Sequence, residues 1–229
     1  MKILIDADII AYRVAAACEN ESLTTARHRA DSMTYDILLS VDHDDLWYDD
    51  WSLHLTNGEN NFRNDVAVTA VYKGNRPSKK PKHLKGVKEH FVEKWGAVFA
   101  EGQEADDAIA IEATALNGDG VIVSLDKDFK QVAGWHYNFI KRIHEYVNEE
   151  DAILFFYKQI LMGDSADNII GLHKVGPVKA EKMLKNCATE IDMYNVCVEA
   201  YESEERVLEN ARLLWLRRFE GQMWEPPNE

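Results

Sequence analysis

The chain has 229 residues, 46% of them hydrophobic and 29% charged, so it can bury a sizeable core and is not globally disordered. The formal net charge of −14 argues against a uniformly basic surface, the three cysteines have no CxxC spacing, and no apolar run approaches the roughly 18 residues of a membrane-spanning helix. A charge follows three apolar residues at the start, which is too soon for a signal peptide. We therefore expect a protein of a reducing cytoplasm with no signal peptide, disulfide framework or membrane segment. We also expect a monomer.

Short apolar runs alternate with helical patterns through the first two thirds of the chain. The expected strands are residues 3–5, 52–56, 97–99 and 121–123, the last a continuous apolar run typical of a strand buried on both faces. The expected helices are residues 8–18, 23–41, 82–95 (ended by Gly96) and 105–116. This order predicts an α/β fold, a mainly parallel central sheet flanked by helices. After about residue 149 the pattern is helical with no further strong strand. We therefore expect an α/β domain over 1–148 and a helical region over 149–229.

Two local groups of basic residues run against the acidic total. The first group contains Lys73, Arg76, Lys79, Lys80, Lys82, Lys85, Lys88 and Lys94, which fall within 22 residues that hold only two acids. The second group contains Lys174, Lys179, Lys182 and Lys185. Because local charge decides where a polyanion can bind, the net charge weakens a nucleic-acid function without excluding it.

Carboxylates follow the predicted strands at their carboxyl ends, where open α/β sheets bind ligands. Asp6 closes the first strand, Glu104, Asp106 and Asp107 open the helix after the third, and Asp126 and Asp128 follow the fourth; Asp164 and Asp167 form a further acidic segment. So many like charges repel unless cations neutralise them. Oxygen ligands suit Mg²⁺ or Mn²⁺, and two such ions about 4 Å apart can hydrolyse a phosphodiester.

Structural roles could explain each acidic segment taken singly. Asp6, Asp126, Asp164 and Asp167 could cap helices or form turns, and the acids from Glu104 onward could complement a helix dipole. Four such segments in suitable positions favour a shared site instead. No competing chemistry stands out, because the chain has no HExxH, GxSxG, GxGxxG or Walker loop.

These segments resemble the motifs of the 5′ nuclease superfamily, which includes bacteriophage 5′–3′ exonucleases, flap endonucleases and the 5′ nuclease domains of bacterial DNA polymerases. The similar segments, in the order of the family, are 5–13, 61–63 with 72–76, 102–107, 124–131 and 163–180. The resemblance implies a PIN-like (resolvase-like) sheet and a C-terminal helix–three-turn–helix. It also implies a metal-dependent 5′–3′ exonuclease or structure-specific 5′-flap endonuclease, acting on duplex DNA with ends, nicks or flaps in phage replication or DNA degradation.

The resemblance also assigns roles to single residues. It places Asp6, Glu104, Asp106 and Asp107 around one Mg²⁺ or Mn²⁺ ion, and Asp126, Asp128, Asp164 and Asp167 around a second. Lys73 and Arg76 would contact the scissile phosphate, Tyr72 would stack on an unpaired terminal base, and Arg13 would hold a nearby phosphate. Alternatively, Tyr72 is a core aromatic and Lys73 and Arg76 are solvated surface charges.

Two further parts of the chain are expected to bind DNA. A short arch around 73–95 would gather a 5′ end through Lys79, Lys80, Lys82 and Lys85. In the helix–three-turn–helix, Gly171 and Gly176 would let backbone amides approach phosphates, Lys179 and Lys182 would add charge, and the loop would hold a K⁺ ion. Binding of this kind carries no base information and is sensitive to salt.

The chain departs from the family at the end of the 52–56 strand. Many relatives carry a further metal-binding Asp there, whereas this chain has Thr56 and Asn57. Asp8 or Asp65 could compensate. Two alternatives therefore stay open: a non-catalytic, structure-specific DNA-binding protein whose first metal site has decayed, and an RNA-directed metal ribonuclease, including cleavage of RNA primers in RNA–DNA hybrids.

Overall fold

The structure of the chain, a computed structural model, describes residues 1–41, 50–58, 61–77 and 79–228. Within these ranges the main sheet has the strand order β3-β2-β1-β4-β5-β6. Its strands are β1 (Lys2–Asp6), β2 (Asp50–Thr56), β3 (Val98–Ala100), β4 (Gly120–Val123), β5 (Gly134–Asn138) and β6 (Ile143–Val147). All neighbouring strands are parallel except β5 and β6, which form an antiparallel edge. The predicted α/β class with a mainly parallel sheet is confirmed.

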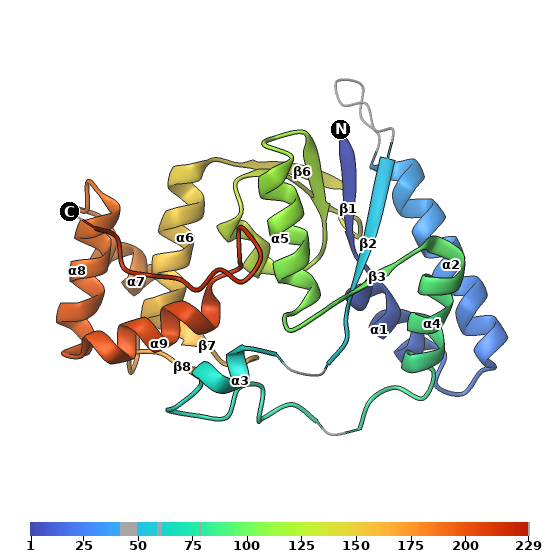
Figure 1. Cartoon of the computed structure of the whole chain (residues 1–229), viewed down its shortest axis with the longest axis horizontal. Coiled ribbons are helices and arrows are strands. Elements are labelled where there is room, and N and C mark those ends of the chain that lie inside the picture. The colour runs from blue at the N-terminus through green and yellow to red at the C-terminus, as the bar shows by residue number, and fades with distance from the viewer. Residues whose placement is uncertain (42–49, 59–60, 78, 229) are drawn as a thin grey trace.

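Helices cover both faces of this sheet (Figure 1). The helices of the first part are α1 (Ala7–Ala17), α2 (Leu23–Ser40), α3 (Arg63–Val66), α4 (Leu84–Trp95) and α5 (Ala105–Ala115). Alternate residues of a strand point to opposite faces. Ile5 and Val123 accordingly pack with α1, α2 and α4, whereas Leu4 and Ile122 pack with α5.

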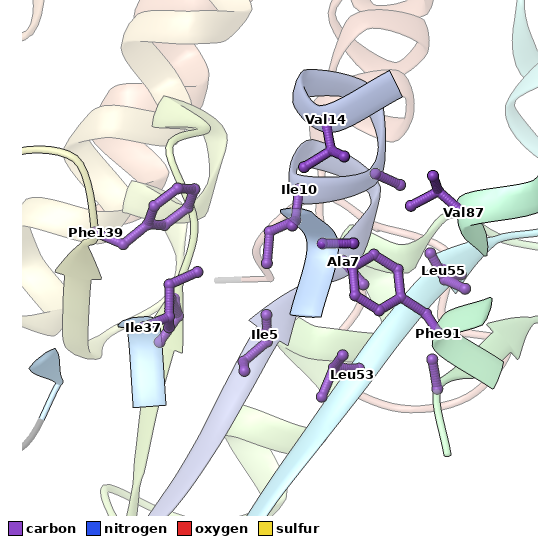
Figure 2. Close-up of a cluster of buried hydrophobic side chains, with 14 of the residues drawn as sticks. Ile5, Ala7, Ile10, Val14, Ile37, Leu53, Leu55, Val87, Phe91 and Phe139 are labelled. Atoms are coloured by element: carbon purple, nitrogen blue, oxygen red, sulfur yellow. The ribbon is translucent and has the colours of Figure 1, made fainter. Parts of the chain in front are cut away.

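The larger of the two cores on the sheet lies against α1, α2 and α4. Figure 2 shows Phe91 of α4 beside Leu53 and Leu55 of β2, and Ile10 of α1 and Ile37 of α2 on the other side of the same cluster, toward Ile5. Their side chains are almost completely buried. Each is worth roughly 1.5–3 kcal/mol relative to an exposed position. This packing holds β1 and β2 in register, which fixes where their carboxyl ends lie.

Helix α4 ends where the sequence predicts, because Gly96 adopts a left-handed conformation with φ 66°. Hydrogen bonds to a buried carboxylate hold the helix in place. Asp31 of α2 accepts these bonds from His90, Lys94 and Trp95. They attach the basic helix of the predicted arch to α2.

At the amino end of the sheet, Glu112 of α5 binds three partners on neighbouring strands. It accepts hydrogen bonds from Ser52 at 2.9 Å and His54 at 2.8 Å, and Lys2 lies 2.9 Å away. Burial opposes ionisation, but these partners outweigh it and lower the pKa of Glu112 to about 2. The network ties α5 to β1 and β2 at the end of the sheet opposite to the predicted site.

The rest of the chain is mainly helical and has its own apolar core. It contains the 3₁₀ helix η1 (Lys127–Gln131), α6 (Glu149–Met162), β7 (Gly163–Asp164), β8 (Ile169–Ile170), α7 (Pro177–Leu184), α8 (Glu190–Tyr201) and α9 (Glu204–Leu214). Phe156, Ile160 and Trp224 lie in this core, so the aromatic tail packs back on the protein. No helix among the described residues is both long and apolar enough to cross a membrane.

The observed strands depart from the sequence expectation in two places. Strands β5 and β6, which extend the sheet beyond β4, were not predicted. After residue 149, β7 and β8 form a small antiparallel pair of two residues each. Gly171, which directly follows β8, lies against the main chain at Gly163. A Cβ added to Gly171 would meet the carbonyl of Met162 at 2.0 Å.

Candidate functional site

Asp6 stands at the carboxyl end of the central strand β1 and is only 2% exposed. It caps α1 by accepting a hydrogen bond from the Ile9 amide at 3.2 Å, and its other oxygen accepts one from the Ser124 hydroxyl at 2.7 Å. Burial raises the pKa of Asp6 to about 7, against the hydrogen bond from Ser124 and with help from the charges of Asp8 and Asp126. A cation nearby would therefore stabilise the charged form of this carboxylate.

Asp106 lies in the first turn of α5 and experiences the same repulsion. Burial raises the pKa of Asp106 well above its ordinary value, and the negative charges of Asp6, Glu104 and Asp126 raise it further. The amine of Lys73 acts in the opposite direction. Asp6, Asp106 and Asp126, which come from three distant segments, are therefore close enough to interact electrostatically.

Asp126 and Asp128 form a tight turn after β4. The Asp126 amide donates to the Ser124 hydroxyl at 3.0 Å, and the Asp126 carboxylate caps η1 by accepting from the Asp128 amide at 2.9 Å. Burial raises the pKa of Asp128 to about 6, and Asp126 and Asp164 add to this rise. The amine of Lys127 lies 2.5 Å from Asp164 and 3.3 Å from Asp128. It lowers the pKa of Asp164 despite the opposing effect of burial.

Glu104 and Asp167 share their cationic and hydrogen-bonding partners. The Tyr72 hydroxyl donates to Glu104 at 2.8 Å and to Asp167 at 2.9 Å. Lys73 forms an ion pair with Glu104 and lies 3.6 Å from Asp167, which also binds Arg76. Asp167 thus lies beside Glu104, although the resemblance assigns these two acids to different ions.

The two segments that carry these partners are docked on each other. The Lys73 amide donates to the Asp167 carbonyl at 2.8 Å, and the Asn75 side chain donates to the Ser165 carbonyl at 2.6 Å. Lys73 has a left-handed backbone with φ 54°. This conformation is uncommon for a residue with a side chain and is held here by the contacts of segment 71–76 with segment 164–168.

Tyr72 is placed differently from the expectation that it stacks on a base. Its side chain is 7% exposed and belongs to the core of the helical region. Burial raises the pKa of Tyr72 well above its ordinary value. Its hydroxyl is engaged by Glu104 and Asp167, so in this arrangement its ring presents no face to a substrate and its contact with the site is through the hydroxyl.

Asp107 also has a role different from the ligand role that the resemblance implies. Its two oxygens lie 2.6 and 2.9 Å from the Arg63 guanidinium, and both residues are almost fully buried. The amides of Glu104 and Arg217 donate to the same carboxylate. Burial opposes ionisation, but the charge of Arg63 outweighs it and lowers the pKa of Asp107. With its oxygens committed to these donors, Asp107 positions the start of α5.

At the end of β2, where many relatives have an acid, Thr56 makes hydrogen bonds to α5 and to Asp8. The Thr56 hydroxyl accepts from the Ala105 amide at 2.9 Å, and the Thr56 amide donates to Asp8 at 2.8 Å. Lys88 of α4 lies 2.5 Å from Asp8. Asn57 is exposed, and so is Asp65 on α3. Asp8, which could compensate for the missing acid, is thus paired with Lys88 at the edge of the site.

The residues expected to bind DNA are mostly on the surface. Those that are exposed are Arg13, Lys79, Lys80, Lys82, Lys85, Gly176, Lys179 and Lys182. Gly176 is the N-cap residue of α7, and a Cβ added there would meet nothing within 4 Å, so the amide end of this helix is open. Gly171 is only half-exposed. A side chain at this position would collide with the main chain of residues 162–163.

The chemistry of these carboxylate donors suits divalent ions, but the distances between them in this structure do not. The donors are carboxylate oxygens, which Mg²⁺ and Mn²⁺ prefer, and the raised pKa values of Asp6, Asp106 and Asp128 mark a deficit of positive charge. Among the described residues, however, no three His, Cys, Asp or Glu side chains are grouped closely enough to hold one ion. The amines of Lys73 and Lys127 occupy positions beside the carboxylates instead.

Sequence reasoning missed several residues that shape the site. Arg63 and Lys127 are ion-pair partners of Asp107 and Asp164, and Gln159 donates to Asp128 at 2.7 Å. Arg63 lies in the 61–63 segment that resembles the family, and this was the one available signal for it. Nothing in the local sequence marks Gln159, because its partner is 31 positions away.

No family model matches the chain, but curated proteins and solved structures do. The chain is 32% identical to flap endonuclease Xni of Shewanella halifaxensis over 122 residues, with 48% of each chain covered. It is 28% identical to Xni of Shewanella piezotolerans over 163 residues (63% of this chain, 64% of that one) and 31% identical to Xni of Shewanella woodyi (61% of each). The matched regions thus span about half to just under two thirds of these relatives.

Solved structures match over nearly the whole chain. Bacteriophage T5 5′-exonuclease with bound zinc aligns with a TM-score of 0.67 and 17% identity, covering 93% of this chain and 89% of that one. The catalytic core of Rad2 in complex with DNA aligns with a TM-score of 0.51 and 16% identity, covering 91% and 70%. At such identities the matches establish a shared fold.

Proposed function

We propose that the chain belongs to the 5′ nuclease superfamily and that it is a divalent-metal-dependent hydrolase of DNA, acting as a 5′–3′ exonuclease or 5′-flap endonuclease. The expected substrates are duplexes with 5′ ends, nicks or flaps. The proposal extends to a role in phage DNA replication or degradation and to a monomer acting in the cytoplasm.

One observation supports the proposal: carboxylates from separate strand ends, with Asp6 buried and Asp106 half-buried, repel one another beside a pair of cationic side chains. Asp126 raises the pKa of both Asp6 and Asp106, and Asp6 raises that of Asp106 further, while Lys73 and Arg76 form ion pairs with the neighbouring carboxylates of Glu104 and Asp167. A structural role alone gives no reason to collect like charges in this way, because each unpaired buried carboxylate costs folding free energy. A site for cations and a phosphate gives such a reason.

We propose that Asp6, Glu104 and Asp106 hold a first ion and that Asp126, Asp128, Asp164 and Asp167 hold a second. Divalent ions bound there would supply Lewis acidity and activate a water for attack on phosphorus. Lys73 and Arg76, now paired with Glu104 and Asp167, would stabilise the charge that develops on the phosphate. Ser124 keeps Asp6 oriented throughout, through its 2.7 Å hydrogen bond.

DNA binding is proposed for the exposed basic residues around this site. Lys79, Lys80, Lys82 and Lys85 would attract a 5′ end before it reaches the carboxylates, and Arg13 would hold a phosphate beyond α1. In the proposed helix–three-turn–helix, the open amide end of α7 at Gly176 together with Lys179 and Lys182 would contact the duplex backbone. A K⁺ ion in the 163–176 loop and a division into regions 1–148 and 149–229 belong to the same proposal.

The contacts of Thr56 favour one alternative, a DNA-binding protein without catalysis. At the end of β2 the chain has a hydroxyl that caps α5 in place of an acid, and Asp8 is paired with Lys88. If this leaves the first ion weakly held, the protein would bind branched DNA without cutting it. A ribonuclease acting on RNA–DNA hybrids is the other alternative, and it differs in substrate alone.

The test incubates the protein with a 5′-labelled nicked or flapped duplex and Mg²⁺ or Mn²⁺. We expect short 5′ products from the wild type and none from Asp126→Asn, which removes metal-binding charge and leaves the basic surface intact. Both proteins should bind the duplex with similar affinity. Absence of any 5′ product across pH and both metals would refute the nuclease proposal, and faster cleavage of a matched RNA strand would favour the ribonuclease.

A further inference from the structure

A mostly buried segment near the C-terminus, Leu213–Arg218, hydrogen-bonds to side chains that reach both acidic halves of the site, the Glu104–Asp107 turn and the Asp126–Asp128 turn. It begins in the last turn of α9 and continues without regular structure, yet most of its residues are buried. In Figure 1 the chain (red) leaves α9 here and loops beside α5. Backbone groups buried outside regular structure need partners. In this segment several of the partners are side chains that also reach the acidic site.

On one side the partner is Arg63. Its Nε donates to the Leu213 carbonyl at 2.8 Å and its Nη2 donates to the Trp215 carbonyl at 2.8 Å. The same guanidinium donates hydrogen bonds to Asp107, which also accepts one from the Glu104 amide at 3.1 Å. This buried side chain connects the 213–218 segment to the first turn of α5, which carries Asp106, and the Arg217 amide adds a direct hydrogen bond to Asp107 at 3.2 Å.

On the other side the connection runs through two buried amides, Gln131 (3% exposed) and Gln159 (1% exposed). Gln131 accepts from the Leu216 amide at 3.2 Å and donates to the Leu214 carbonyl at 2.7 Å. These two contacts fix the orientation of its amide group. Gln131 also donates to the Gln159 oxygen at 3.1 Å, which leaves the Gln159 N–H group to donate to Asp128 at 2.7 Å.

The order of donors and acceptors has a chemical consequence. Because the backbone of the 213–218 segment sets the orientation of Gln131, and Gln131 sets that of Gln159, an N–H group rather than an oxygen faces Asp128. A hydrogen bond from this N–H group restricts the rotation of the Asp128 carboxylate. The segment thereby influences a carboxylate that none of its own residues contacts.

We propose that the 213–218 segment fixes the spacing and orientation of the two halves of the acidic site, with Arg63, Gln131 and Gln159 as positioning residues. The inference rests on the proposed function, because it concerns the carboxylates that would hold the ions. It adds to that function a role for a segment and three side chains that neither bind substrate nor bear catalytic charge. Partners of metal ligands commonly change metal affinity about 10- to 100-fold when they are removed.

The test compares Gln159→Met and Gln131→Met with the wild type. Methionine keeps the approximate volume of glutamine and removes its hydrogen bonds, so packing is retained. Tyr157→Phe is the matched control, because it removes a hydrogen bond from the same helix as Gln159, at the Tyr157–Glu190 contact, without reaching the 213–218 segment. Three measurements are made on each protein: Mn²⁺ affinity by calorimetry, kcat and KM on a 5′-labelled flap, and amide hydrogen exchange without metal.

We expect Gln159→Met to weaken Mn²⁺ binding about 10-fold or more and to lower kcat rather than raise KM. Gln131→Met should have the same effects and also speed exchange in 124–131 and 213–218, whereas Tyr157→Phe should match the wild type in all three measurements. Wild-type Mn²⁺ affinity and kcat in both methionine variants would overturn the inference. If the wild type neither binds Mn²⁺ nor cleaves, the proposed function fails. In that case amide hydrogen exchange still tests the positioning role. Unchanged exchange rates in 124–131 and 213–218 of Gln131→Met would refute it.

Discussion

Replacing Arg63 by methionine should destabilise the protein by about 3–5 kcal/mol, the usual cost of breaking one partner out of a buried ion pair. Arg63 and Asp107 are 2% and 0% exposed, and they are joined by hydrogen bonds of 2.6 and 2.9 Å. Without the guanidinium, the Asp107 carboxylate has no countercharge at that point. The carbonyls of Leu213 and Trp215 lose donors as well. Since typical domains have about 5–15 kcal/mol of stability, the loss should be large.

The pH dependence gives this prediction a definite sign. In the wild type Arg63 lowers the pKa of Asp107, so the pair stabilises the protein above the ordinary carboxyl pKa and its contribution is lost as the pH falls through the lowered value. In Arg63→Met, burial should instead raise the pKa of Asp107. The deficit relative to wild type should therefore be greatest near neutral pH and shrink toward about pH 4.

Urea unfolding at about pH 7 and about pH 4.5 measures both effects. The control is the double variant Arg63→Met with Asp107→Asn, in which the buried charge is gone and an acceptor for the Glu104 and Arg217 amides remains. It should recover part of the lost free energy at neutral pH. A loss below about 1 kcal/mol in the single variant, or no recovery in the double variant, would show that this ion pair does not anchor the start of α5.

Three further predictions concern other parts of the molecule. Gly171→Ala should prevent β7 and β8 from pairing and cost several kcal/mol in urea unfolding, whereas Gly176→Ala, with open space around it, should change stability little. Glu112→Gln should lower the free energy of unfolding by about 1–3 kcal/mol above about pH 5, and the difference should vanish as the pH falls through about 2, the pKa of the carboxyl in the folded state. Equal deficits at every pH would contradict that assignment. Replacing Lys179 and Lys182 together by alanine should weaken duplex binding for all sequences and reduce the dependence of log K on log salt by about 2, measured by fluorescence anisotropy; an unchanged slope would remove both from the DNA contact.

The predictable part of the fold is the part encoded by local patterns. The apolar runs of β1 and β4 and the glycine at the end of α4 are visible in the sequence, and each element lies within a few residues of its expected bounds. Strands β5 and β6 were missed because residues 134–138 and 143–147 mix aromatic, charged and polar side chains, so they lack a continuous apolar run.

The site was predictable in position rather than in its contacts. Asp6 and Asp126 could be placed at the carboxyl edge, because each closely follows a predicted strand of a parallel sheet. The engagement of Asp107 by Arg63 could not be foreseen, since it depends on a contact across 44 residues and on full burial of both groups. For Tyr72 a core position was one of two alternatives, and the local sequence could not decide between them because its environment is formed by the distant helical region.

Soaking crystals of the protein in Mn²⁺ and locating the ions by their anomalous scattering tests the proposed metal site most directly. We expect manganese at the carboxyl edge of the sheet, within about 2.0–2.4 Å of oxygens of Asp6, Asp106 and the acids that follow β4. The amines of Lys73 and Lys127 should leave Glu104 and Asp164, where they lie without metal. An absence of anomalous density at this edge at saturating Mn²⁺, with both amines still paired to their carboxylates, would contradict the assignment of these acids as metal ligands.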